Sequence, residues 1–148
     1  MRHIAIIPLL IIMLLTSGCT QNNGEIAPWF GTWRLESITC NGEPSDDYHG
    51  QMTWSFQNNI ICLVTDLGHH SYTQTWGTWA APEGERKLLL DFDQRDDING
   101  TNVYTPPSWL GFDGLQPTLT IVSQSSREMT LKLDNTNGSY LYCLKKLY

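Results

Sequence analysis

Short segments in which apolar and polar residues alternate run through the chain from Gly31 onward. Met52, Trp54 and Phe56 are separated by Thr53 and Ser55, and the same alternation recurs at 87–92 and 129–134. A period of two is typical of β-strands that bury one face, whereas a helix would need apolar residues at i, i+3, i+4 and i+7. The pattern predicts an all-β domain.

The alternating segments, separated by glycine and asparagine, predict eight strands. They cover residues 31–41, 51–57, 60–65, 72–80, 87–92, 118–124, 128–134 and 139–146. Eight strands are enough to close a small barrel. We therefore expect a small eight-stranded antiparallel up-and-down barrel.

The faces of several strands can be assigned from the alternation. Met52, Trp54 and Phe56 are expected to point inward, and Asn58-Asn59 is suited to a type I′ turn, which needs positive φ at both residues. That turn places Leu63 and Ile61 inside, opposite Trp54 and Phe56, and leaves Ile60, Cys62 and Val64 outside. The last strand is apolar on both faces, so its orientation stays open.

The first residues have the features of an export signal. A basic start precedes twelve uncharged residues from Ile4 to Leu15, too few to span a membrane, and Thr16-Ser17-Gly18 leads into Cys19. This segment resembles the lipobox of bacterial lipoproteins. The resemblance implies a signal peptide at 1–18, acylation of Cys19, a lipid-anchored flexible tether at 19–27 and a folded domain at 28–148.

The charge of the mature chain narrows the range of partners. Without Arg2, eight Lys and Arg residues stand against fifteen Asp and Glu, so the net charge is −7. A chain with this excess of negative charge is not expected to bind nucleic acid, whose phosphates are also negative. No G-x-S-x-G elbow and no phosphate-binding glycine loop occur, and His49, His69 and His70 lack a spacing that would fix two ligands on one face. We predict no catalytic residues, no metal site and no cofactor.

The stretch "FGTWRL" opens the first predicted strand with G-x-W, from Gly31 to Trp33. This motif resembles the lipocalin signature, and the mature chain is similar to compact lipocalin-like lipoproteins. In that family the tryptophan covers the barrel floor and a cation from the last strand packs on its indole. The resemblance implies this role for Trp33, with Lys145 or Lys146 in place of the family's usual arginine. A plain core tryptophan after a flexible glycine is the alternative.

Connections in an up-and-down barrel alternate between its two ends. Residues 43–49, 66–70, 93–116 and 134–138 should therefore share the open end. The long connection contains Trp109, Leu110 and Phe112, which are too apolar for a solvated loop tip. We expect it to pack over the mouth, either as a lid that touches a ligand through Trp109 or as a seal with nothing to bind.

Three cysteines remain if Cys19 is acylated. Cys40 and Cys143 lie near meeting ends of the first and last strands, which makes them a candidate disulfide; the alternative is three free thiols, including Cys62.

Two functions fit these features, and neither is an enzyme. The first is a small apolar or amphipathic ligand bound inside the barrel, as apolar pockets with a few polar groups allow. Its candidate contacts are the aromatic residues Trp54, Phe56, Tyr72, Trp76, Phe92, Trp109 and Tyr142. The second is a filled barrel that acts as an interaction module or protease-inhibitor-like domain for an envelope protein. We expect the chain in the cell envelope, anchored to the outer membrane and facing the periplasm.

Overall fold

The computed structural model describes residues 28–93 and 105–148, so the predicted signal peptide and tether lie outside the described residues. No helix in the described part is long and apolar enough to cross a membrane. One 3-10 turn, η1 (Ser108–Leu110), accompanies the strands. The strands are β1 (Gly31–Cys40), β2 (Glu43–Pro44), β3 (Met52–Gln57), β4 (Ile60–Gly68), β5 (Ser71–Ala80), β6 (Lys87–Asp91), β7 (Thr118–Gln124), β8 (Glu128–Asn135) and β9 (Gly138–Lys146).

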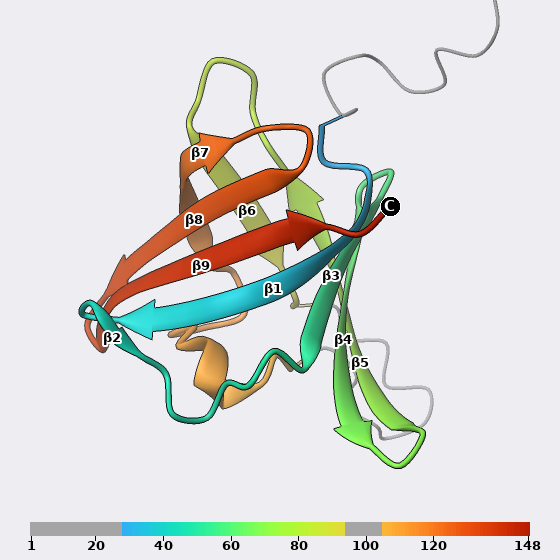
Figure 1. The fold of residues 1–148 in the computed structure, drawn as a ribbon. Coiled ribbons are helices and arrows are strands. Elements are labelled where there is room, and N and C mark those ends of the chain that lie inside the picture. Colours follow the sequence, from blue (N-terminus) through green and yellow to red (C-terminus); the bar gives the residue numbers. More distant parts are fainter. Residues whose placement is uncertain (1–27, 94–104) are drawn as a thin grey trace, which may run out of the picture.

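The sheet closes on itself, as Figure 1 shows. β1 and β3 to β9 pair in an antiparallel order, and β1 also pairs with β9 from Trp33 opposite Lys146 to Cys40 opposite Tyr140. The predicted eight-stranded antiparallel barrel is confirmed. β2 was not predicted, because it has two residues and contains a proline; it pairs only with Thr39 and Cys40 at the end of β1.

The β3–β4 hairpin has the predicted register, with Trp54 opposite Leu63. The predicted turn type is wrong, because of the two turn residues only Asn58 has positive φ, at 51°. The register holds without that turn because Trp54 and Leu63 are 0% and 1% exposed, and a slip of one residue would turn the buried side chains of one of the two strands outward. Cys62 points outward as expected, yet it is buried because it lies opposite Trp76 on the outer face.

The orientation of β5 differs from the prediction. Ile61 pairs with Gly77 and Leu63 with Thr75, and residues opposite each other share a face, so β5 turns Thr75, Gly77 and Trp79 inward. Gly77 is needed here because a Cβ would lie 2.6 Å from Phe92 Cδ1. The Phe92 ring therefore occupies the space that a side chain at position 77 would take.

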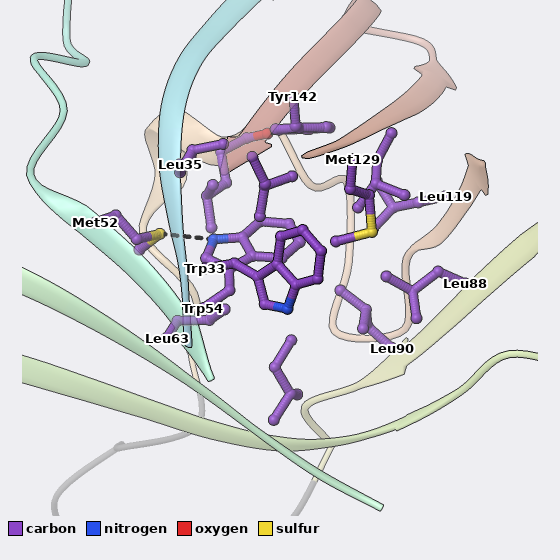
Figure 2. Packing of buried hydrophobic residues seen from close by; sticks show 14 of the residues in the cluster. Trp33, Leu35, Met52, Trp54, Leu63, Leu88, Leu90, Leu119, Met129 and Tyr142 are labelled. Carbon is purple, nitrogen blue, oxygen red and sulfur yellow. Dashed lines mark hydrogen bonds between the residues drawn. The ribbon is translucent and has the colours of Figure 1, made fainter. Parts of the chain in front are cut away.

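Large side chains fill the interior of the barrel. Figure 2 shows Trp33 beside Trp54, surrounded by aliphatic and methionine side chains from several strands. Trp54 Nε1 donates a hydrogen bond to Met52 Sδ at 3.1 Å, which satisfies its buried N–H. The open question about β9 is answered by Tyr142 and Leu144, which point inward and are 0% and 2% exposed.

Candidate functional site

The strand directions bring four connections to one end of the barrel, as predicted. The β1–β3 connection, the β4–β5 turn, the described parts of the segment between β6 and β7 (residues 92–93 and 105–117) and the β8–β9 turn all lie there. Figure 1 shows this end at the bottom, with η1 in orange below the barrel. We call this end the mouth and the opposite end, where β1 begins, the floor.

Residues 106–112, here called the cover, lie across the mouth. Their central turn η1 buries Leu110 completely, at 0% exposure. Tyr142 Oη donates a hydrogen bond of 2.5 Å to the Leu110 carbonyl, and Asn135 Nδ2 donates one of 2.7 Å to the Gly111 carbonyl. Gly111 has a φ of 74°, and a Cβ there would lie 2.3 Å from the Tyr140 ring. The side chains of Tyr142 and Asn135 thus bind backbone carbonyl groups of the cover, and the Tyr140 ring lies close to Gly111.

Aromatic rings extend this contact on both sides. The Phe112 ring stacks on Phe92, with centroids 6.2 Å apart, and meets Tyr142 edge-on at 6.1 Å. Trp109 is half-buried and packs against Tyr48, with ring centroids 5.3 Å apart. Such ring pairs contribute about 0.5–1.5 kcal/mol each beyond the burial of their area. The expectation that this connection packs over the mouth is confirmed for residues 106–112; residues 94–104 lie outside the described part of the chain.

Tyr48 supports the cover from the β1–β3 connection. Its hydroxyl donates a hydrogen bond to the Leu35 carbonyl, and burial raises its pKa to about 12. Tyr48 is the only aromatic residue between Asn41 and Gly50, and that isolation in a polar stretch is the signal by which the sequence could have revealed it.

Titration of Tyr48 predicts a loss of stability in alkali. An unfolded tyrosine ionises near pH 10, and Tyr48 in the fold near pH 12. The unfolded chain therefore loses this proton first, so the stabilisation is complete below about pH 10 and falls as pH rises toward 12. Urea unfolding midpoints from pH 8 to 11.5 should fall less steeply for Tyr48→Phe than for the wild type. Tyr72→Phe, which changes an exposed tyrosine, should keep the wild-type slope, and equal slopes in all three would contradict the assignment.

Trp33 lies near the floor, two residues after the start of β1, and is 0% exposed. Its Nε1 donates a hydrogen bond of 2.8 Å to the Trp29 carbonyl, and Lys146 Nζ lies 5.2 Å from the ring centroid. Of the two lysines named from the sequence, Lys146 is the one whose ammonium group lies over the indole. Lys145 is the residue opposite Arg34 in the antiparallel pairing of β1 and β9. A Cβ on Gly31 would lie 2.2 Å from the Tyr148 carbonyl oxygen, so this glycine allows the C-terminal segment to pass close by.

The structure separates the predicted ligand contacts into three groups. Trp54, Phe56, Phe92 and Tyr142 lie together in the interior, each at 0% exposure. Trp109 belongs to the cover. The interior placement of Tyr72 and Trp76 is wrong, because both point outward from β5 and are 62% and 38% exposed. Aromatic residues occur on both faces of β5, so alternation alone did not identify the inner one.

Of the two alternatives for the cysteines, the structure has the three free thiols, Cys40, Cys62 and Cys143, and the candidate disulfide between Cys40 and Cys143 is not formed. The first and last strands are neighbours as expected, but Cys40 lies opposite Tyr140 and Cys143 lies opposite Ser37. An irregularity between Leu35 and Ser37 changes the alternation of β1, so that Cys40 is on the inner face and Cys143 on the outer. Sulfurs on opposite faces cannot bond without movement of the backbone.

Two concavities are lined by described residues. One, of about 470 Å³, follows β5 and β6 from Asn59 to Asp91 and is also lined by Gln116 and Thr118. The other, of about 180 Å³, lies on the outer face of β3, β4 and β5 and includes Cys62 and Trp76. Within residues 28–93 and 105–148, no three His, Cys, Asp or Glu side chains are grouped closely enough to hold a metal ion.

Comparisons with known proteins agree with this architecture. A crystal structure of a lipocalin-like protein from Bacteroides uniformis is similar, with a TM-score of 0.59 and 14% identity over 81% of this chain and 99% of that one. An uncharacterized protein from Bacteroides eggerthii gives 0.58 and 17% over 80% and 98%. At these identities the likeness concerns the fold alone. No curated protein matches the chain. The model of the lipocalin-like domain family matches residues 13–142, and the chain belongs to that family.

Proposed function

We propose that this protein binds a small apolar or amphipathic molecule at the mouth of its barrel, in the place that the cover occupies. The observation that carries the proposal is the complete burial of Leu110 in the cover, which side chains of the described part of the barrel hold through the hydrogen bonds from Tyr142 to Leu110 and from Asn135 to Gly111. The strands form the wall of the barrel, and the cover is an insert that a ligand can replace.

The wall beneath the cover has the chemistry of a lipophilic site. Phe92 and Tyr142 contact the Phe112 ring and would be uncovered if it moved. Thr65 and Thr75 add two buried hydroxyl groups on the mouth side, and Thr75 Oγ1 lies 3.5 Å from the Thr105 carbonyl. An apolar surface with a few hydroxyls suits a molecule with a long apolar part and one polar end. The acidic charge of the chain disfavours an anionic head group.

Ligand entry would be an exchange of contacts. When the cover is in place, the Tyr142 hydroxyl is bound to the Leu110 carbonyl. When the cover leaves, that bond is broken, and the apolar surface left by Leu110 and Phe112 is filled by the apolar part of the ligand. The apparent affinity therefore depends on the fraction of molecules in which the cover is open.

Tyr142→Phe tests this exchange, because it removes the bond to the cover and keeps the ring. The loss of one such bond is worth about 0.5–1.5 kcal/mol, so affinity for the neutral fluorophore N-phenyl-1-naphthylamine should rise about 2- to 10-fold. Fluorescence titration measures the change. Tyr72→Phe removes the same atom from an exposed tyrosine and should leave the affinity unchanged. If the fluorophore binds neither the wild type nor Tyr142→Phe, the mouth does not open and the proposal fails.

We place this activity in the cell envelope, with Cys19 acylated, the barrel anchored to the outer membrane and the mouth in the periplasm. The lipobox-like sequence before Cys19 supports the anchor. The folded part begins at the floor, next to Gly31, so a tether that enters there would leave the mouth directed away from the bilayer.

A second function is favoured by the filled interior. Trp33, Trp54, Phe56 and Tyr142 are all fully buried, which is the packing of a core rather than of an empty pocket. In this case the barrel would act as a binding module for an envelope protein. Affinity capture of the full chain after crosslinking in cells, followed by mass spectrometry, would then recover one partner in stoichiometric amount, and a co-purified small molecule would favour the first function.

A further inference from the structure

The β4–β5 hairpin extends beyond the body of the barrel toward the mouth, as Figure 1 shows. β4 pairs with β5 along the whole hairpin, up to Gly68 opposite Ser71. On its other side, among the residues that the structure describes, β5 pairs with β6 only at Thr78, Trp79 and Ala80. The stretch from Ser71 to Gly77 therefore has one edge with no neighbouring strand in the described part of the chain.

The hydrogen-bond pattern identifies which backbone groups face that edge. Trp79 N–H donates to the Asn59 carbonyl on the β4 side, at 3.0 Å. In an antiparallel pair successive residues alternate between the two sides. Tyr72, Gln74 and Trp76 therefore direct their N–H and C=O groups toward the open edge, while the odd-numbered residues bond to β4.

This edge lacks the features that usually prevent strands from pairing. Natural edge strands carry lysine, proline or a bulge. β5 has the sequence SYTQTWGTWA, with no charged residue and no proline, and the irregularity in the hairpin lies in β4, between Asp66 and Gly68. β7 offers a contrast, because the Arg86 guanidinium bonds to the Ile121 and Val122 carbonyls and covers them.

We propose that this edge of β5 pairs with the same edge of a second copy of the chain. The edge is self-complementary about Gln74: in an antiparallel pair centred there, Tyr72 of each copy lies opposite Trp76 of the other. The backbone N–H and C=O groups of these three edge residues, which have no partner strand among the described residues, then form hydrogen bonds with those of the other copy. Aromatic pairs of this kind add to strand pairing, and the pair would shield rings that are now 62% and 38% exposed.

The symmetry of the edge about Gln74 favours a second copy as the partner. Each mature chain carries a net charge of −7, and this edge is a place where two copies can approach without opposing charged side chains of the strand itself. The outer concavity of about 180 Å³ adjoins this edge through Gln74 and Trp76, and its apolar lining of Ile60, Cys62 and Val64 extends the surface that a second copy would cover. The contact is small, which predicts a weak and concentration-dependent dimer.

Gln74→Lys tests the pairing, because it places two like charges opposite each other at the centre of the interface. Sedimentation velocity of the full mature chain in density-matched nonionic detergent should show a wild-type monomer–dimer equilibrium. The variant should dimerise at least about tenfold more weakly, as expected for opposed like charges on a strand pair. Gln124→Lys makes the same change at an exposed glutamine of β7 and should dimerise like the wild type. Thermal unfolding checks that both variants are folded.

Amide hydrogen exchange provides a second measurement with residue resolution. As the wild-type concentration rises, the amides of Tyr72, Gln74 and Trp76 should gain protection, while Thr73 and Thr75, already bonded to β4, should not change. The proposal is overturned if the wild type stays monomeric at all concentrations, or if Gln74→Lys dimerises as the wild type does. It is also overturned if the amides of Thr73 and Thr75 gain as much protection as those of Tyr72, Gln74 and Trp76. Pairing of the edge with a different protein in place of a second copy would overturn it as well.

Discussion

Trp33→Ala is expected to lower the free energy of unfolding by about 3–5 kcal/mol, the usual cost of removing a large buried aromatic side chain. Two contacts are lost and a cavity is left. The Trp29 carbonyl loses its hydrogen-bond donor, Lys146 loses the ring beneath its ammonium group, and the space of the indole is left unfilled. Because a domain of this size has only about 5–15 kcal/mol in total, the variant should be close to unfolding. Urea denaturation monitored by circular dichroism measures the change.

Trp76→Ala is the matched control for that experiment. It removes the same side chain from the outer face of β5, where the ring is 38% exposed against 0% for Trp33. Its cost should be below about 1 kcal/mol, the range for surface changes with modest contact loss. Equal destabilisation by the two substitutions would mean that Trp33 near the floor stabilises the barrel no more than a tryptophan on its outer face, and that the lipocalin-like signature at Gly31 has no special structural role.

Cys19→Ser should release the protein from the membrane fraction almost completely. Two or more acyl chains hold a protein on a bilayer far more firmly than one chain, at about 0.8 kcal/mol for each buried CH₂, and serine offers no thiol for the first of them. Fractionation of cells followed by immunoblotting would show the variant in the soluble fraction. Intact-mass measurement of the wild type should show the mass of the added lipids and the loss of residues 1–18.

Cys143→Ser is the control for the anchor. Cys143 is a free, half-buried cysteine on β9, so its replacement changes one thiol without touching the lipobox. This variant should stay in the membrane fraction. A Cys19→Ser protein that fractionates like the wild type would show that another segment holds the chain on the membrane, and it would remove the basis for placing the mouth in the periplasm.

The sequence predicted the strands well because the burial of one face leaves a direct record in the alternation. The strands expected at 51–57 and 118–124 are β3 (Met52–Gln57) and β7 (Thr118–Gln124) in the structure. The register of β3 and β4 was predictable for the same reason, since only one alignment buries both Trp54 and Leu63. The apolar residues of the cover were also visible, because Leu110 and Phe112 had no reason to stand in a solvated loop.

The sequence-based predictions failed where the inner face of a strand, or the position of one strand relative to another, could not be decided from the alternation of apolar and polar residues. β5 has Trp76 on one face and Trp79 on the other, and only its pairing with β4 decides that Trp79 is inside. The Cys40 and Cys143 pair failed because a single irregularity in β1 changes which residues point inward beyond it. Neither feature depends on local composition, so neither can be read from one sequence.

The attachment of the cover suggests how the ligand specificity of the proposed site at the mouth could change. Tyr142 and Asn135 hold the carbonyl oxygens of Leu110 and Gly111, and every amino acid has a carbonyl oxygen. Substitutions at Leu110 or Phe112 could therefore reshape the entrance while both fastenings remain in place. Substitutions that change the ligand of the proposed site should accordingly occur at the positions of Leu110 and Phe112 and not at those of Tyr142 and Asn135, which bind the main chain of the cover.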